Sequence, residues 1–534
     1  MEYPLLIKNL LLHPIAYHPD QEIVYADKRR VRYREFRARV KQLANALTQR
    51  GIGQGDVVAV VDYDSHRYLE CYFAIPMIGA VLHTVNVRLS PEQMLYTINH
   101  AEDDLILVHK DFVPLIESIQ PHFETVKALV ILDDDADACA YEQMLAEASA
   151  TFDFPDLDEN TRATTFYTTG TTGDPKGVWF SHRQLVLHTL TTIATFASSA
   201  VQGRFHREDV YMPITPMFHV HAWGFPYVAT MLGVKQVYPG PYIPEKLLEL
   251  IDREHVTLSH CVPTILHMML THPQSQQVDL SGWKAIIGGS ALPKGLCRAA
   301  LDRGIDIFAG YGMSETCPIL TVTQLDEEML QLDRDAQVEI RTRTGRPIGL
   351  VELEIVDEDM HPQPHDGVHT GEIVVKTPWL TPEYTKNPSA TEELYRGGYL
   401  HTGDVATIDT QGFVRITDRV KDIIKVSGEW VSSLRLEDIL SKHPAVSEVA
   451  VIGIPHPRWG EIPLGLVVLK PDISATEKEL IGFIKRSIKE GVLAREGMLI
   501  RIALVDAIAK TSVGKIDKKR LRQLYAEGKL GAKT

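Results

Sequence analysis

Residues 166–178, FYTTGTTGDPKGV, bring small hydroxyl side chains, glycines and a lysine together in one short stretch. Glycines let main-chain amides approach a ligand closely, and threonine hydroxyls and a lysine ammonium suit phosphate oxygens. The stretch is not a Walker loop, because Pro175 precedes Lys176 and Gly177 follows it. A surface hairpin is the alternative, since threonine, glycine, aspartate and proline are common in turns. Both interpretations stay open on these residues alone.

Further glycine-containing or polar stretches follow at wide separations. They are PMFHVHAWG (216–224), IIGGSALP (286–293), GYGMSET (310–316), YLHTGD (399–404), DRVKDIIKVSGEW (418–430) and KTSVGK (510–515). A tyrosine such as Tyr311 is commonly a core residue, and an aspartate before a loop, such as Asp404, often serves a turn. Each stretch alone is weak evidence for a site.

Taken together and in this order, the stretches from about 166 to 515 resemble the adenylate-forming superfamily. That superfamily contains acyl-CoA synthetases, luciferases and the adenylation domains of peptide synthetases. The segment PMFHVHAWGFPYVATMLGVKQVYPGP is most similar to bacterial medium- and long-chain fatty acyl-CoA synthetases and to methylthiopropionate-CoA ligases. The resemblance implies that a carboxylate attacks the α-phosphate of ATP, giving acyl-adenylate and pyrophosphate, and that the thiol of coenzyme A then displaces AMP.

The resemblance also assigns an ATP and Mg²⁺ site. The carboxylate is itself the nucleophile, so the first step depends on positioning and charge stabilisation rather than on a general base. The implied ATP-binding residues are Thr168, Thr169, Gly170, Thr171, Thr172, Gly173, Lys176, Gly288, Gly289, Gly310, Tyr311, Gly312, Ser314, Asp404, Arg419 and Lys515. In this set the flat face of Tyr311 would meet the adenine ring, and the two acceptor oxygens of Asp404 would suit the paired hydroxyls of the ribose. Thr171 and Glu315 would hold Mg²⁺, for which carboxylate oxygen is a suitable ligand. The alternative for Glu315 is an acid favoured in the first turn of a helix.

Three residues are expected to be catalytic, namely Lys515, Lys176 and His219. His219 and His221 could suggest a metal pair, but no third or fourth ligand is evident. We therefore expect His219 at the substrate carboxyl group and His221 as an incidental polar residue. The acyl substrate would meet His219, Val220, Trp223 and Gly288. Trp223 resembles an aromatic gate to an acyl tunnel, whereas a tryptophan in an apolar stretch is often simply core.

The C-terminal part carries the remaining assignments. The resemblance places Lys421 at a hinge, Lys515 in adenylation, and Gly428 and Trp430 on the coenzyme A side. The chain departs from the family by having Ser314 where threonine is usual, which keeps the hydroxyl, and Ala509-Lys510-Thr511 where Pro-Arg-Thr is more common. The alternative for Lys515 is one more solvated basic residue near Lys518 and Lys519.

The elements expected to position these residues are those of an α/β protein. Apolar residues at helical spacing predict a helix over 34–50, and Ser90, Pro91 and Gln93 begin another with a capping box. Strands are predicted at 56–61, 104–109 and 128–135, and their alternation with helices indicates doubly wound parallel sheets. We expect an N-terminal adenylation domain of residues 1–417, including a β-barrel-like portion. A small mobile α+β domain would follow over 418–534.

Composition narrows the class of protein further. The 534 residues are 44% apolar and 23% charged, as in an ordinary globular protein, and the net charge of −15 disfavours nucleic acid and anionic membranes as partners. Five separated cysteines, no secretory leader and no apolar run of membrane-spanning length favour the cytoplasm. The acidic run 133–138 is interpreted as a solvated loop.

The leading hypothesis is therefore an AMP-forming fatty acid ligase that uses Mg²⁺, ATP and coenzyme A. A homodimer is a further expectation from the resemblance. One alternative is adenylation for another acceptor or a short acid such as 3-methylthiopropionate. The other is a non-catalytic binding protein that kept the fold, which fold alone does not exclude. The length of the acyl chain is not determined by the sequence.

Overall fold

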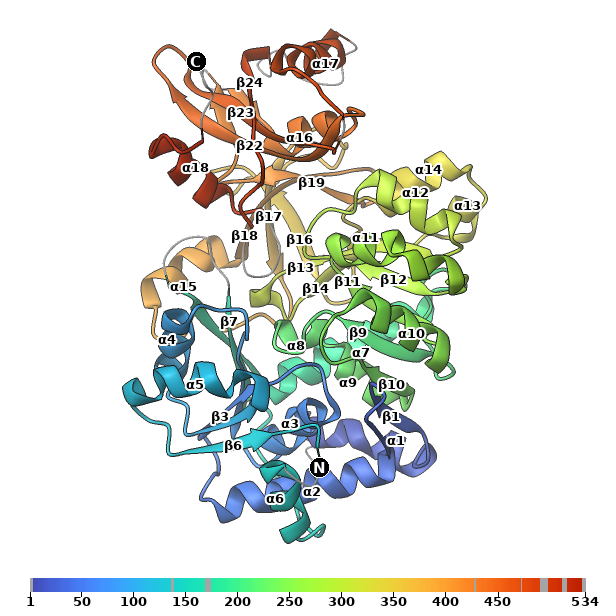
Figure 1. The fold of residues 1–534 in the computed structure, drawn as a ribbon, viewed down its shortest axis with the longest axis vertical. Helices are drawn as coiled ribbons and strands as arrows, with labels where there is room; N and C mark the ends of the chain where they lie inside the picture. The colour runs from blue at the N-terminus through green and yellow to red at the C-terminus, as the bar shows by residue number, and fades with distance from the viewer. Residues whose placement is uncertain are drawn as a thin grey trace. The chain divides into compact units, whose positions relative to one another are not determined.

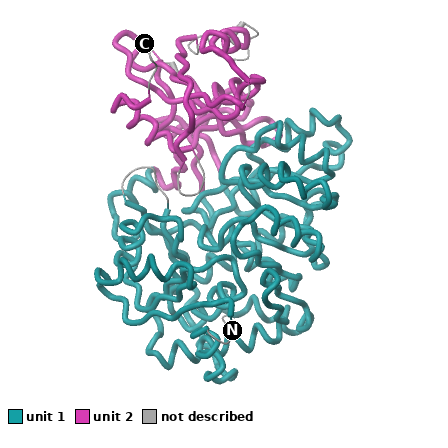
Figure 2. The backbone as a smooth tube through the Cα atoms, viewed as in Figure 1, with its two compact units in different colours: residues 1–168, 174–352, 376–396 teal, residues 169–173, 353–375, 397–534 magenta. Residues whose placement is uncertain are grey.

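A computed structural model describes residues 3–135, 139–168, 174–426, 429–471, 473–489, 498–510 and 516–530. The chain divides into two compact units (Figure 2). Unit 1 contains residues 1–168, 174–352 and 376–396, and the described part of unit 2 contains residues 353–375 and the chain from 397 onward. A domain boundary at residue 417 stays a prediction.

A nine-stranded sheet dominates unit 1, in the order β15-β14-β13-β12-β11-β9-β10-β1-β2 (Figure 1). The six strands from β13 to β1 run parallel to one another, while β2, β14 and β15 pair antiparallel. The strands are β1 (Glu22–Tyr25), β2 (Arg29–Arg32), β9 (Val210–Ile214), β10 (Lys235–Tyr238), β11 (Leu258–Cys261), β12 (Lys284–Ile287), β13 (Asp306–Gly312), β14 (Ile319–Val322) and β15 (Arg346–Pro347).

A second sheet of unit 1 has six strands, in the order β6-β5-β3-β4-β7-β8. All neighbours are parallel except β7 and β8, which form an antiparallel pair. The strands are β3 (Val57–Val61), β4 (Val81–Thr84), β5 (Leu105–His109), β6 (Ala128–Leu132), β7 (Arg162–Thr168) and β8 (Lys176–Ser181). The first three of these strands in the chain are buried at every position, as parallel strands covered on both faces require.

Helices supply the apolar layers that cover these sheets. Leu247 and Ile251 of α10, Leu266 of α11 and Cys297 of α12 pack into one cluster with strand residues such as Ile287. The helices of unit 1 are α1 (Leu12–Tyr17), α2 (Tyr33–Gln49), α3 (His66–Met77), α4 (Pro91–Ala101), α5 (Val113–Ile119), α6 (Ala140–Glu147), α7 (His182–Ser198), α8 (Val220–Trp223), α9 (Phe225–Leu232), α10 (Pro244–Glu254), α11 (Pro263–Thr271), α12 (Lys294–Asp302), α13 (Glu327–Leu330), α14 (Arg334–Arg341) and α15 (Pro388–Leu394).

Unit 2 combines two sheets with three helices among its described residues. Its four-stranded sheet has the order β16-β17-β18-β19, and its five-stranded sheet has the order β21-β20-β23-β22 with β24 beside β23. The strands are β16 (Glu352–Val356), β17 (Gly371–Lys376), β18 (Leu400–Ile408), β19 (Val414–Arg419), β20 (Ile424–Val426), β21 (Glu429–Val431), β22 (Val446–His456), β23 (Gly460–Leu469) and β24 (Arg501–Leu504). The helices are α16 (Ser433–Ser441), α17 (Glu477–Lys489) and α18 (Lys518–Ala526). The β-barrel-like portion stays a prediction.

Several local expectations are confirmed by this architecture. The helix expected over 34–50 is α2, and the strand expected over 56–61 is β3. Ser90 caps α4 by accepting the amide of Gln93, with Pro91 in the first turn. Across the described residues, no helix combines the length and apolar character needed to cross a membrane.

The interpretation of residues 133–138 as simply solvated is wrong for Asp134. Its carboxylate accepts hydrogen bonds from Tyr25 (2.9 Å) and Arg67 (3.1 Å), and it also pairs with Lys28. The run of acidic residues in the sequence does not reveal these partners, because they lie 109, 106 and 67 residues earlier in the chain. Residues 136–138 lie outside the described residues.

Candidate functional site

The predicted acyl and adenine segments meet at one edge of the nine-stranded sheet. Strand β9 has β10 on one side and β11 on the other, so the chain changes direction across the sheet at β9. Ligands of open parallel sheets bind outside the carboxyl ends of strands at such a point. The loop carrying His219 follows β9, Gly288 follows β12, and residues 310–312 end β13. The fold therefore places these three predicted segments at a typical ligand-binding edge.

Two of the predicted glycines are required by close packing at this edge. A Cβ atom on Gly288 would lie 2.7 Å from Cη2 of Trp223 and 3.0 Å from the carbonyl oxygen of Gly310. A Cβ atom on Gly312 would overlap the carbonyl oxygen of Pro318. Glycine at these two positions thus permits both the indole ring and the main chain to approach. Tyr311 and Ser314 are half-buried beside them.

Trp223 ends a turn with an unusual main chain. Val220, His221, Ala222 and Trp223 all have positive φ, at 47°, 54°, 47° and 58°. Left-handed residues other than glycine cost roughly 1–2 kcal/mol each, so the surrounding structure must hold this turn in place. The Trp223 ring stacks on His260 with ring centroids 4.9 Å apart and an interplanar angle of 28°.

His221, which the sequence predicts to be an incidental polar residue rather than a metal ligand, lies in the core. It is fully buried, and its Nε2 atom lies 2.9 Å from the Thr164 hydroxyl. Burial lowers the pKa of His221 to about 3, so the ring is neutral at physiological pH. No group of three or more histidine, cysteine or acidic residues suited to a metal occurs in the described part of the chain.

A short array of three side chains lies beside the predicted phosphate-binding segment. Strands β7 and β8 pair antiparallel with Thr168 opposite Lys176, so the two ends of the loop between them meet. The Lys176 ammonium lies 4.6 Å from the centroid of the Tyr384 ring, and the Tyr384 hydroxyl donates to Oε1 of Glu315 at 2.6 Å. One tyrosine thereby holds a cation over its face and a carboxylate at its hydroxyl.

Both ends of this array are fixed by further hydrogen bonds. Glu315 is buried in the short helix η5 (Ser314–Thr316), and its carbonyl oxygen accepts the amide of Thr381 at 2.8 Å. The Thr385 amide donates to the carbonyl oxygen of Gly177 at 2.9 Å. Burial raises the pKa of Tyr384, and the charge of Glu315 raises it further, so the hydroxyl stays a donor.

The described part of unit 2 holds the other predicted nucleotide residues. Asp404 of β18 is buried and lies opposite Arg419 of β19, with Nε of Arg419 3.1 Å from Oδ1 of Asp404. Lys421 lies two residues beyond the end of β19, and its carbonyl oxygen accepts from Arg522 of α18 at 3.2 Å. The residue predicted for the ribose and the predicted hinge residue thus both lie at or beside β19.

Seven of the nine remaining predicted residues fall in segments that the structure does not describe. Thr169, Gly170, Thr171, Thr172, Gly173, Gly428 and Lys515 lie outside the described residues. Trp430 lies in β21 opposite Lys425 of β20. Gly289 follows Gly288 with φ of 77°.

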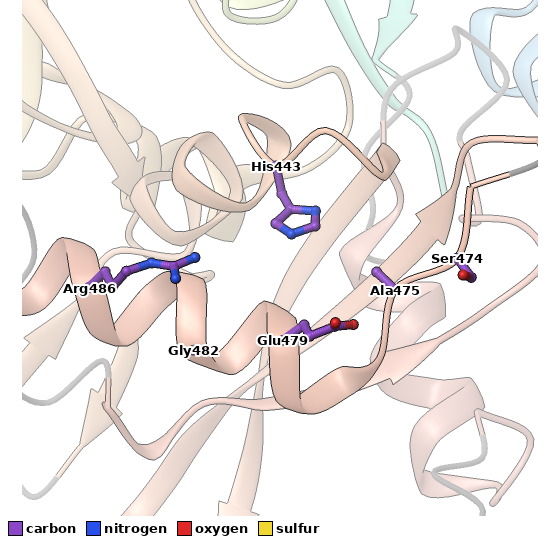
Figure 3. Close-up of a pocket in the computed structure, with 6 residues that line it drawn as sticks. All are labelled: His443, Ser474, Ala475, Glu479, Gly482 and Arg486. Atoms are coloured by element: carbon purple, nitrogen blue, oxygen red, sulfur yellow. The ribbon is translucent and has the colours of Figure 1, made fainter.

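A pocket of about 380 Å³ lies elsewhere in unit 2, against α17 (Figure 3). His443, Ser474, Ala475, Glu479, Gly482 and Arg486 line it. None of these is a predicted ATP, acyl or coenzyme A residue. Glu479 also caps α17, because its carboxylate accepts the Thr476 amide at 2.7 Å, so at least one polar lining group has a structural role.

Sequence reasoning missed Tyr384, His260 and Asp64, all of which contact predicted site segments. Tyr384 lies in TPEYTKNP, a polar and aromatic stretch between prolines that could have been flagged as a loop near a site. His260 lies inside strand β11, and no turn or loop residues around it mark it as part of a site. Asp64 lies in DYDS directly after β3, and its contact with residue 217 spans 153 positions.

The chain belongs to the AMP-binding enzyme family. The family model matches residues 12–385, and the model of the AMP-binding enzyme C-terminal domain matches residues 435–515. The first match includes every strand of the nine-stranded sheet. The second begins inside α16 and extends through β24.

Known proteins similar to this chain are of the same kind. A long-chain-fatty-acid–CoA ligase of Thermus thermophilus is 40% identical, over 93% of this chain and 90% of its own length. A 3-methylmercaptopropionyl-CoA ligase of Ruegeria pomeroyi is 38% identical, over 99% and 98%. The crystal structure of ATP-bound MatB from Rhodopseudomonas palustris is similar with a TM-score of 0.85 at 25% identity, covering 99% of this chain and all of that one.

Proposed function

We propose that this protein is an AMP-forming fatty acid–CoA ligase. It would activate a medium- or long-chain carboxylate with ATP to acyl-adenylate and pyrophosphate, and then transfer the acyl group to coenzyme A. The relatives that are named as long-chain-fatty-acid and 3-methylmercaptopropionyl ligases match over nearly the whole chain and support this class. The 3-methylthio acid is the alternative substrate.

The observation that carries the proposal is the array of Lys176, Tyr384 and Glu315. It brings one ammonium and one buried carboxylate beside the hairpin whose loop is predicted to hold the β- and γ-phosphates. The carboxylate gives a hard oxygen ligand, and the ammonium gives a counter-charge for phosphate. This is the equipment that adenylation needs, because charge stabilisation at phosphorus is its main burden.

Mg²⁺ fits this donor set, with Glu315 and Thr171 as its proposed protein ligands. The metal would neutralise charge on the phosphate oxygens when bound. The residues of the chain have separate tasks: Lys176 balances phosphate charge, His219 lies at the substrate carboxyl group, and Lys515 stabilises charge during adenylation. Asp404 and Arg419 would bind the ribose side.

Release of AMP and pyrophosphate tests the proposal. The purified chain is incubated with ATP, Mg²⁺ and coenzyme A, together with straight-chain acids from acetate to stearate and with 3-methylthiopropionate. We expect release that peaks at one chain length and needs coenzyme A for turnover. A peak at 3-methylthiopropionate would select the alternative substrate. No acid-dependent release, with ATP still bound, would refute the proposed activity.

A further inference from the structure

The loop that carries His219 is held by three buried side chains, one after β3, one in α3 and one in β4. Asp64 Oδ1 accepts the amide of Met217 at 2.8 Å, and the Thr84 hydroxyl donates to the carbonyl oxygen of Phe218 at 3.0 Å. The Tyr72 hydroxyl donates to the carbonyl oxygen of Met217. Three polar groups of successive residues are therefore fixed by three different side chains immediately before His219.

Asp64 occupies a special place in the topology. It follows β3, which has β4 on one side and β5 on the other, so β3 is the strand at which the six-stranded sheet changes direction. Met217 follows β9, the corresponding strand of the nine-stranded sheet. The main chain of Asp64 also contacts the segment after β10 of the nine-stranded sheet. Its carbonyl oxygen accepts the Gly240 amide at 3.0 Å. Asp64 thus joins the two strand ends at which ligands of such sheets bind.

A carboxylate at this position is costly for folding. The residue is 3% exposed, and the hydrogen bonds to its two oxygens come from the Met217 amide and from the Tyr242 hydroxyl (2.5 Å) rather than from a cation. Burial raises the pKa of Asp64 to about 7, and the bonds from Tyr242 and Met217 oppose that rise. The ionisable groups that face it are Asp62, Tyr68, Tyr72, Arg88, Tyr211, Tyr238 and Tyr242. A group that costs stability without an ion pair is a candidate for a role in activity.

We propose that Asp64 is a positioning residue for the acyl-acid site, because its carboxylate fixes the Met217 main chain and thereby sets the place of His219. The inference rests on the proposed function, in which His219 lies at the substrate carboxyl group. The ionised form accepts from both donors at once. In the protonated form one oxygen carries a hydrogen, so it competes with the Tyr242 hydroxyl, and the carboxyl group becomes a weaker acceptor for the amide.

Steady-state AMP formation by variants of the full chain tests the proposal. Asp64→Ala should raise KM for the acid about tenfold, the size expected from losing one hydrogen bond to a charged group, and leave KM for ATP nearly unchanged. Asp64→Asn keeps an acceptor for the amide, so it should recover most of the loss. If Asp64→Ala does not fold, Asp64→Asn and Tyr242→Phe decide the question through pH.

The pH profiles distinguish positioning from a purely structural role. Between about pH 6 and about pH 8, kcat/KM for the acid should rise in the unaltered chain and stay flat in Asp64→Asn, which has no proton to lose. Tyr242→Phe removes a donor that favours the ionised form, so its rise should move to higher pH. Asp103→Asn is the matched control, because Asp103 is also buried with a raised pKa but pairs with His83. It should keep the rise of the unaltered chain.

Two results would overturn the inference alone. One is an equal increase in KM for acid and ATP in Asp64→Ala, and the other is an Asp64→Asn profile that superimposes on that of the unaltered chain. Absence of any acid-dependent AMP formation by the unaltered chain is a different result. It would refute the proposed function, and the inference would fall with it.

Discussion

At the scale of single residues, the hydroxyl of Tyr384 is the contact that most directly restrains a proposed metal ligand. It donates to Glu315 at 2.6 Å while its ring carries Lys176. Tyr384→Phe keeps the ring and removes the hydroxyl. We expect the Mg²⁺ concentration for half-maximal AMP formation to rise about tenfold, because removing a partner of a metal ligand typically weakens metal binding by 10–100-fold.

The matched control for that change is Tyr395→Phe. Tyr395 lies at the C-terminal end of α15, and its hydroxyl donates to the main-chain oxygen of Thr381. It should shift the Mg²⁺ requirement much less. Equal Mg²⁺ requirements in Tyr384→Phe and the unaltered chain would contradict the assignment of Glu315.

Asp64 gives a second prediction at this scale, on stability rather than on activity. Its pKa is raised by burial to about 7 from 3.8, so the folded chain keeps its proton over a range in which the unfolded chain has lost it. The stabilisation from this proton is present below about pH 4 and is lost as pH rises through about 7. Asp64→Asn does not ionise, so we expect it to melt at a higher temperature than the unaltered chain at about pH 8, with a smaller difference at about pH 5.

Thermal unfolding at the two pH values measures this difference, which corresponds to a few kcal/mol at most. Asp279→Asn serves as a control, because Asp279 is exposed and its pKa is lowered by bonds from Ser281. It should bring no gain at the higher pH. A difference in melting temperature between Asp64→Asn and the unaltered chain that does not grow from about pH 5 to about pH 8 would be incompatible with a raised pKa.

At the scale of elements, the end of strand β13 is the part of the site with the least room. A Cβ atom on Gly312 would overlap the carbonyl oxygen of Pro318, and main-chain atoms cannot move aside as a flexible side chain can. Gly312→Ala should therefore lower stability by about 1–3 kcal/mol and sharply reduce AMP formation. Denaturant unfolding measures the first effect.

Gly295→Ala is the companion variant for that comparison. Gly295 lies in α12, where an added Cβ atom meets nothing within 4 Å, so alanine should be tolerated or stabilising by up to about 1 kcal/mol. If the two variants unfold at the same denaturant concentration, the close packing at Gly312 is not a constraint in solution.

Elements with local signals could be predicted from the sequence. The apolar stripe of α2 and the Ser90 cap of α4 depend only on neighbouring residues, and both occur as expected. The left-handed turn of residues 220–223 could not be predicted, because these four residues include no glycine, the residue that usually marks a positive φ. That turn is stabilised by distant partners such as His260 and Thr164, which local patterns do not reveal.

The same limit applies to the site. Motifs with glycines and charged residues located the segments that the fold brings to the edge of the nine-stranded sheet. Tyr384 and Asp64 form hydrogen bonds with residues 69 and 153 positions away, and only the folded chain reveals these contacts. The burial of His221 is likewise visible only in the folded chain, because its sequence neighbours give no sign of it.

At the scale of the whole molecule, the family matches span both compact units, over residues 12–385 and 435–515. The net charge of the chain is −15, and the cations proposed for ATP are the single residues Lys176, Arg419 and Lys515. Such a distribution suits a small anionic substrate that is bound by specific groups rather than by a broad field. The central claim for the molecule is that the substrate carboxylate itself attacks the α-phosphate of ATP.

One measurement tests that claim most directly. The purified chain is given ATP, Mg²⁺, coenzyme A and a fatty acid whose carboxylate carries isotopically heavy oxygen, and the products are analysed by mass spectrometry. The acyl–oxygen bond breaks when the thiol displaces AMP, so one heavy oxygen should leave with each AMP formed. Heavy oxygen in inorganic phosphate, or AMP without any label, would contradict attack of the carboxylate at the α-phosphate.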